Sequence, residues 1–270
     1  MPNLYTKYQK IWDAKDNSLD TLYKHLRNYI IDVDDYGNIT AVNRLNTDIA
    51  AFCCHLDTVH SAKPEIKVIK DDVMISTNGI GVGGDDKCGI IACLEMLESD
   101  VPCKAIFFRD EERGCLGSRE YDAQSLKDNL FLIEIDRKGG KDLIFNSGGV
   151  QLCDKQFEKE VKEAFPHGKP AQGLLTDVNV LGAAQINMMN LSAGYYNPHT
   201  DYEYVILSEL QRNIDCLYNF AKNYTEKRVF VRKQPKRGLY EANTGKGIWA
   251  FCEENPGQEE YDLLEGIKQA

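Results

Sequence analysis

The sequence predicts an α/β fold, with three layers in which a mixed, mainly parallel sheet carries helices on both faces. Short apolar segments of strand length alternate along the chain with segments whose apolar residues recur at helical spacing. The segment 48–54 is almost wholly apolar, which is typical of a strand buried on both faces of a parallel sheet. With 270 residues, 43% of them hydrophobic, the chain is long enough to enclose a large core.

The first half of the chain begins with helical spacing over 4–30, interrupted by a cap at Asn17 and Ser18. A hairpin follows over 31–42, turning at 34–38, and then the apolar strand 48–54. The remaining elements expected here are a hairpin of 66–69 and 73–77 around Asp71 and Asp72, a glycine-rich break at 79–84, and a helix over 87–97.

The second half of the chain repeats the alternation of strands and helices. We expect strands at 104–108, 130–135, 143–146 and 188–192, and helices at 114–121, 155–165, 177–183 and 207–224. The composition then changes, because 227–237 holds six Lys or Arg in eleven residues and the chain from Glu253 is acidic. The sequence therefore predicts one large domain over 1–226 and an extension over 227–270 packed on it.

Composition excludes several classes of protein. The 42 acidic residues exceed the 32 basic ones, giving a formal net charge of −10, which disfavours binding to phosphate backbones by the chain as a whole. The longest apolar runs, such as 50–54, fall short of the roughly 20 residues of a membrane-spanning helix. The first residues lack the pattern of a signal peptide, and the nine Cys show no C-x-x-C pair, so we expect reduced thiols and a cytoplasmic protein.

Polar side chains that can bind metals follow several predicted strands, where sites of α/β folds assemble. His55 and Asp57 follow the apolar strand, and alternation places them on the same side, which suits a metal-binding imidazole oriented by a carboxylate. Gly83 and Gly84 precede Asp85 and Asp86 at the start of a helix. A phosphate-binding loop would end in Gly-Lys-Ser/Thr, which is missing, and paired acids favour a cation. A helix cap is the alternative.

Three further segments extend the pattern. Asp110, Glu111 and Glu112 follow the strand 104–108, Asp136 ends the strand 130–135, and the turn 195–203 carries His199. Each segment alone is as well explained by solvated charge or by packing. Their joint occurrence in this order is what points to a site.

The series HLDTV, GGDDKCG, DEERG, IEID and NPHTDYE resembles the co-catalytic dizinc metallopeptidases, the superfamily of peptidase T, bacterial zinc aminopeptidases and amino-acid deacylases. The resemblance covers about residues 50 to 224. It implies a zinc-peptidase fold of the phosphorylase/hydrolase-like type and two Zn²⁺, with Mn²⁺ or Co²⁺ as alternatives.

The resemblance also implies a role for each matching residue. His55, Glu112, Asp136 and His199 would be metal ligands, and Asp85 would be the carboxylate that bridges both metals. Glu111 would be the general base for a metal-activated water, Asp57 would orient His55, and the Asp85–Asp86 peptide is a candidate for the cis form.

The implied function is a metal-dependent amide hydrolase, most simply a dizinc aminopeptidase or dipeptidase acting on small peptides. A deacylase of N-acyl amino acids remains an alternative, because the same cluster would serve either amide. A non-catalytic binding homologue is a second alternative, and nucleic-acid binding by 227–237 is a third. The sequence indicates no oligomeric state and no membrane partner.

Two features depart from the family pattern. Only 62 residues separate Asp136 from His199, too few for the inserted lid or dimerisation domain of peptidase T and the deacylases. We therefore expect a catalytic core without a lid. Arg113 replaces a small or aliphatic residue and would either bind a substrate carboxylate or point to solvent.

Overall fold

The computed structural model describes residues 3–15, 19–46, 48–69 and 72–233. These belong to one compact unit, Met1–Lys233. The predicted cap at Asn17 and Ser18, the turn residue Asp71, and the extension from 234 onward, with its acidic tail, lie outside the described residues.

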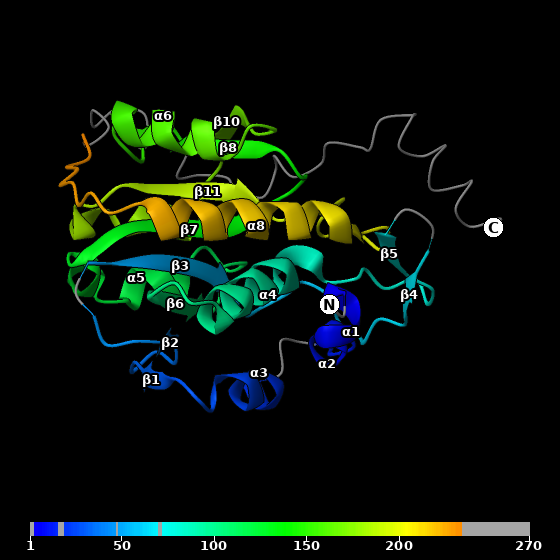
Figure 1. The fold of residues 1–270 in the computed structure, drawn as a ribbon. Coiled ribbons are helices and arrows are strands. Elements are labelled where there is room, and N and C mark those ends of the chain that lie inside the picture. The colour runs from blue at the N-terminus through cyan, green and yellow to red at the C-terminus, as the bar shows by residue number, and fades with distance from the viewer. Residues whose placement is uncertain (1–2, 16–18, 47, 70–71, 234–270) are drawn as a thin grey trace, which may run out of the picture. The chain divides into compact units, whose positions relative to one another are not determined.

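A nine-stranded mixed sheet forms the centre of the molecule (Figure 1). Its order is β1(Ile30–Val33), β2(Ile39–Val42), β6(Cys103–Phe108), β3(Ile49–His55), β7(Asn129–Arg137), β11(Met188–Ser192), β8(Asp142–Ser147), β10(Lys169–Gly173), with β9(Val150–Gln151) paired to β8. The four strands β6, β3, β7 and β11 run parallel, while β2 and β8 flank them in the opposite direction. The sheet is therefore mixed with a parallel centre, as predicted.

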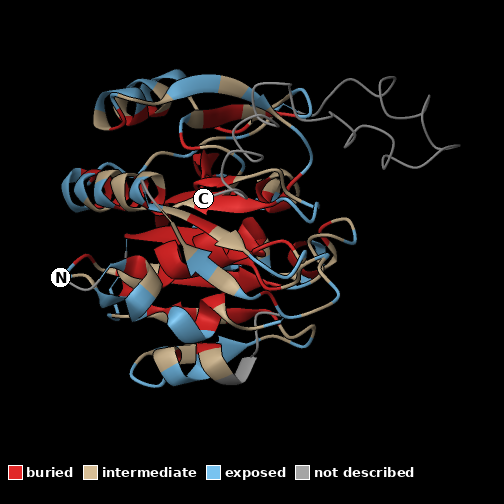
Figure 2. Ribbon diagram, turned by 90° about the vertical axis from the view of Figure 1, so that its right-hand side faces the viewer, coloured by how far each residue is buried: buried red, intermediate tan, exposed pale blue. Residues whose placement is uncertain are grey.

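Helices cover both faces of this sheet. On one face lie α4(Gly84–Glu98), α6(Lys155–Ala164) and α8(Leu207–Asn223), with α4 and α8 side by side in Figure 1. The other face carries α5(Leu116–Glu120), η2(Ala123–Leu126), α7(Asp177–Val180) and η3(Gly182–Ala184). Strand β3 shows why two layers are needed, since Phe52 and Cys54 enter the first core and Ala51 and Cys53 enter the second. Figure 2 shows the resulting buried sheet between exposed outer helix surfaces.

The N-terminal segment packs against the first face. It forms α1(Leu4–Lys7), α2(Gln9–Trp12) and α3(Leu19–Leu26), whose apolar side chains Trp12, Leu22 and Leu26 join the larger core. The buried ammonium of Lys87 donates to the carbonyl oxygens of Trp12 and Ala14, at 2.9 and 2.8 Å, and so ties this segment to the start of α4.

The structure contains a second, smaller sheet, of which the sequence predicted one hairpin. The expected hairpin is present as β4(Ile66–Val68) and β5(Val73–Ser76). It pairs with β13(Tyr204–Ile206), which pairs in turn with β12(Tyr195–Tyr196). The turn between β12 and β13 carries His199, so this sheet connects that turn to the segment that follows β3.

Helix α4 begins irregularly. Its bounds are Gly84–Glu98, but Asp85 (φ −82°, ψ 100°) and Asp86 (φ −121°, ψ 48°) lack helical dihedrals, so regular helix starts near the predicted residue 87. The peptide bond between Asp85 and Asp86 is cis, as the resemblance implied.

The chain after α8 runs across the amino ends of the central strands. Val229 forms a bridge with Ile186, and Lys227 pairs with Asp48 and Asp128, which precede β3 and β7. Arg228 pairs with Glu160 of α6. The first residues of the basic segment are thus engaged with acids of the main domain.

None of the helices in the described residues is long and apolar enough to cross a membrane. The eight described cysteines are all free, and seven of them are buried.

Candidate metal centre

Five elements bring the seven predicted site residues to one edge of the central sheet. His55 ends β3 and Asp57 follows it, the loop after β6 carries Glu111 and Glu112, and Asp136 lies near the end of β7. Asp85 comes from the amino end of α4, and His199 from the turn between β12 and β13. The parallel strands β3, β6 and β7 end side by side, so residues far apart in sequence meet at their carboxyl ends.

The carboxylate of Asp85 stands between the two imidazoles. Its Oδ1 lies 2.9 Å from His55 Nε2, and its Oδ2 lies 3.2 Å from His199 Nε2. Asp136 Oδ1 lies 3.7 Å from the same nitrogen of His55, and Glu112 Oε1 lies 3.0 Å from that of His199. The residues thus divide into two half-sites that share Asp85: His55 with Asp136, and His199 with Glu112.

Asp57 connects the first half-site to the loop after β6. One of its oxygens accepts from the backbone N–H of Glu111 and the other from that of Glu112, both at 3.0 Å. Its Oδ1 also lies 3.3 Å from His55 Nδ1, close enough for charge pairing although the N–H is not aligned for a hydrogen bond. Asp57 therefore faces the ring nitrogen of His55 that points away from Asp85.

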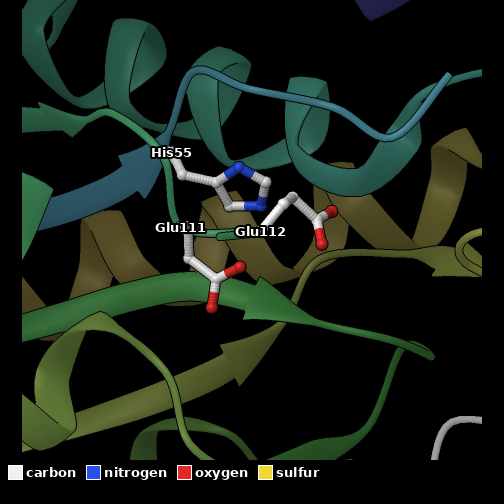
Figure 3. Close-up of side chains that lie close together, drawn as sticks. All are labelled: His55, Glu111 and Glu112. Carbon is white, nitrogen blue, oxygen red and sulfur yellow. The ribbon is translucent and has the colours of Figure 1, made fainter. Parts of the chain in front are cut away.

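The carboxylates of Glu111 and Glu112 lie beside the imidazole of His55 (Figure 3), and one atom of each of the three residues fits within 4.8 Å of the others. Asp85, Glu112 and His199 form a second such group, and His55, Asp86 and Asp136 a third. Asp86 differs from the other acids, because its oxygens accept from the backbone N–H groups of Gly89 and His55. These bonds direct Asp86 toward the backbone.

Unlike Glu112, Glu111 makes no ion pair with either imidazole among the described contacts. Burial raises its pKa to about 8, and the neighbouring acids Asp177 and Glu112 add to the shift against the opposing effect of His55. The thiol of Cys115 lies 3.6 Å from its Oε1 as a weak donor. A carboxyl group with this pKa suits the transfer of protons near neutral pH.

Burial and neighbouring charges also shift the pKa values of Asp85, Asp136 and His199. Burial and the charge of Asp85 raise the pKa of Asp136 well above its usual range. For Asp85, burial acts in the same direction but hydrogen bonds from His199 and His55 outweigh it and lower the pKa. Those same contacts with Asp85 and Glu112 raise the pKa of His199 to about 11. The contacts of Asp85 thus lower its own pKa and raise that of His199.

The donor set fits divalent cations. Two half-sites, each with one imidazole nitrogen and one carboxylate of its own, share a third carboxylate between them. Buried Glu112 Oε1 and His55 Nδ1 have no well-aligned hydrogen-bond partner. Nitrogen and carboxylate ligands in this number are those that Zn²⁺ binds, and Mn²⁺ and Co²⁺ accept them too.

Sequence reasoning missed several residues that hold the ligands in place. The Tyr195 hydroxyl donates to Asp136 Oδ1 at 2.9 Å. Asn190 exchanges two hydrogen bonds with the backbone of Asp136. Glu203 accepts from the backbone N–H of Asp85. Asn190 and Tyr195 lie on other strands, and Glu203 ends the segment NPHTDYE, so their contacts with the ligands are set by the fold and not by a local pattern.

Arg113 points to solvent, with 70% of its side chain exposed and a single 3.5 Å contact to Asp110. Asp177 is the first residue of α7, and Thr176 is the cap residue of that helix. Asp177 is fully buried and accepts from Ser118 Oγ at 2.5 Å, next to the buried acid Glu134. Residues 137–198 build strands and helices of the main domain, so no inserted lid separates Asp136 from His199.

No protein family model and no curated protein matches this sequence. Solved structures do match it. The aminopeptidase PepT from Bacillus cereus is 15% identical, with a TM-score of 0.67 over 82% of this chain and 97% of that one. A tripeptidase from Staphylococcus aureus is 13% identical, with a TM-score of 0.69 over the same shares, 82% and 97%.

A third match extends the comparison to another group of peptidases. The TET1 peptidase from Pyrococcus horikoshii, described as assembling into a tetrahedron or an octahedral shell, is 11% identical, with a TM-score of 0.62 over 81% of this chain and 99% of that one. The chain therefore has the fold of these peptidases. The resemblance suggested by the five motifs is confirmed at the level of the fold.

Proposed function

We propose that the protein is a metal-dependent amide hydrolase, specifically a dizinc aminopeptidase or dipeptidase that acts on small peptides. The observation that carries the proposal is the position of Asp85, whose two oxygens face the two imidazoles. A carboxylate in this position can bind two cations at once. The aminopeptidase fold supports the same reaction class.

His55, Asp85 and Asp136 would hold one cation, and His199, Asp85 and Glu112 the other. When bound, the two cations supply polarisation of the scissile carbonyl and lower the pKa of a water molecule toward about 7. Zn²⁺ is the proposed ion, and Mn²⁺ or Co²⁺ would fit the same donors.

The protein itself supplies the proton transfer. Glu111 accepts a proton from the attacking water and delivers it to the leaving amine. Asp57 holds the backbone of Glu111 and Glu112 and faces His55, so it fixes the base relative to one metal ligand. Burial of Glu111 keeps its pKa close to the pH at which it must exchange protons.

We also propose that 1–226 forms the catalytic domain and 227–270 an extension. The described part of that extension packs on the domain through Val229 and Arg228. The free thiols of the described residues support a reducing, cytoplasmic location.

The test is metal analysis followed by a substrate screen. The purified full-length protein should hold close to two metal equivalents and should hydrolyse aminoacyl or dipeptide substrates until a chelator is added. Hydrolysis of N-acyl amino acids alone would make it a deacylase. Two bound metals with no hydrolysis of any of these substrates would leave a binding protein and contradict the proposal.

Glu111→Gln separates binding from chemistry. It should retain both metals, because Glu111 is not a proposed ligand, and should lose hydrolysis by at least about a hundredfold. Glu120→Gln, an exposed site on α5, is the matched control and should match the wild type. Full activity of Glu111→Gln would show that another group is the base.

A further inference from the structure

Glu203 lies four residues after His199, immediately before β13, and its side chain is completely buried. Its carboxylate accepts three hydrogen bonds. Oε2 accepts from the backbone N–H of Gly83 at 2.6 Å and from His60 Nε2 at 2.7 Å, and Oε1 accepts from the backbone N–H of Asp85 at 2.9 Å. One side chain therefore joins the turn that carries His199 to the loop that carries Asp85.

The segments joined by Glu203 are packed without spare room. A Cβ atom on Gly81 would lie 2.1 Å from the ring of His60 and 2.5 Å from the carbonyl oxygen of Thr200. A Cβ atom on Gly84 would lie 2.7 Å from side-chain atoms of Tyr195 and Val205. Glycine at these positions lets the loop before Asp85 touch the segments on both sides of His199. The hydrogen bonds of Glu203 then fix this close contact.

The two half-sites depend on this connection to different extents. In the half-site of His199, both His199 and Asp85 lie on segments that Glu203 joins, and only Glu112 comes from elsewhere. In the half-site of His55, Asp85 alone depends on Glu203, because His55 and Asp136 lie on β3 and β7 of the central sheet. Loss of Glu203 should therefore disturb one half-site more than the other.

We propose that Glu203, supported by His60, is a positioning residue that sets the distance between Asp85 and His199 and so controls occupancy of the second metal site. The inference rests on the proposed function for its two metals. It goes further by assigning unequal roles to the half-sites: the one on the central sheet is held by the fold, and the one at His199 is held by Glu203.

A carboxylate is required at this position because three donors point at two oxygens. A glutamine would offer one oxygen and one NH₂ group, and the NH₂ group would face at least one N–H donor. Glu203→Gln keeps the size of the side chain and removes one acceptor, so it tests the connection without opening a cavity.

In the experiment, the metal-free full-length protein is titrated with Zn²⁺, and the heat of binding is measured by calorimetry. In Glu203→Gln, the affinity for one of the two Zn²⁺ ions should fall by about 10- to 100-fold, the usual cost of losing a group that orients a ligand. The affinity for the other ion should change by less than about threefold. His60→Gln should give a smaller loss of affinity for the same ion, and the double variant should be no worse than Glu203→Gln. Glu160→Gln, at the Arg228 ion pair, is the control and should bind like the wild type.

The His199→Ala background identifies which half-site is affected. With only the half-site of His55 left, adding Glu203→Gln should change Zn²⁺ affinity by less than about threefold. If the wild type binds two Zn²⁺ ions, and Glu203→Gln lowers the affinity for both ions equally or for neither, the inference is overturned and the proposed function remains intact. A wild type that binds fewer than two would refute the metal centre itself. Should Glu203→Gln fail to fold, His60→Gln decides by the same criteria.

Discussion

Charged residues gather both where the central parallel strands begin, here called the amino edge, and where they end, the carboxyl edge. Their charges are balanced differently at the two places. At the amino edge, Lys227 lies 3.0 Å from Asp48 and 3.3 Å from Asp128. At the carboxyl edge, Asp85 and its neighbours share two imidazoles, and burial raises the pKa of Asp136 and Glu111. The first edge is neutralised by a lysine of the chain, whereas the second gathers more carboxylates than its two imidazoles can balance.

This difference distinguishes ion pairs that stabilise a fold from charges that carry a function. Exposed pairs such as those of Lys227 contribute at most about 1 kcal/mol each. Buried carboxylates that repel one another cost stability, and a protein retains them where a ligand offsets that cost. The contrast between the edges therefore supports a functional site at the carboxyl edge.

The largest effect should follow from removing the shared carboxylate. Asp85→Asn should abolish binding of at least one metal and lower hydrolysis by at least about a thousandfold, because both half-sites lose a charged ligand. Metal content measured after dialysis against trace Zn²⁺, together with turnover, checks this. Asp100→Asn, which removes an exposed acid paired with Lys222, is the control and should have neither effect. Retention of two metals by Asp85→Asn would remove Asp85 from the ligands.

Packing under the site can be tested at Gly89. A Cβ atom there would lie 2.3 Å from Asp86 Oδ2 and 2.3 Å from the carbonyl oxygen of Ile135. Gly89→Ala should therefore destabilise the metal-free protein by about 1–3 kcal/mol, since α4 would have to move away from β7. Chemical denaturation measures the change, and Ser208→Ala on the exposed side of α8 should stay within about 0.5 kcal/mol of the wild type. An unchanged midpoint would contradict the close contact.

Metal affinity should rise with pH. Contacts with Asp85 and Glu112 raise the pKa of His199 to about 11, so this imidazole is protonated at neutral pH in the metal-free protein and must lose its proton to bind a cation. Between pH 6 and 8, Zn²⁺ affinity should increase by about tenfold per pH unit for each proton displaced. Calorimetry in two buffers with different ionisation enthalpies would count the protons released. An affinity that does not change over this range would show that no proton is displaced and would contradict the raised pKa of His199.

The smallest effect should come from the amino edge. Lys227→Ala removes the exposed pairs with Asp48 and Asp128, at 3.0 and 3.3 Å, and should lower stability by no more than about 1 kcal/mol for each pair. Metal content and turnover should be unchanged, because the altered residue lies at the amino ends of β3 and β7. A loss of metal in this variant would show that the two edges are coupled.

Much of the fold could be predicted from the sequence because its central elements have strong patterns. The apolar segment of β3 and the helical spacing of α8 fixed their positions to within one residue. Strand β10 was missed, since Lys169, Pro170 and Gln172 are atypical of a strand, and its place at the edge of the sheet is what tolerates the proline.

The residues of the candidate site also differ in how clearly the sequence reveals them. Ligands that follow strands, such as His55 and Asp136, stand out because a polar residue ends an apolar run. Glu203 ends the segment NPHTDYE, but no pattern in that segment assigns it a role, because its partner Gly83 is 120 residues away in sequence. The importance of such a residue depends on the folded arrangement, which no pattern in a single sequence records.

The central claim is that Asp85 binds two cations, and zinc-edge anomalous diffraction from crystals of the protein soaked in Zn²⁺ tests it most directly. The account predicts two peaks about 3.5–4 Å apart, one beside His55 and Asp136 and the other beside His199 and Glu112, each in contact with one oxygen of Asp85. A single peak, or peaks that do not touch Asp85, would contradict it.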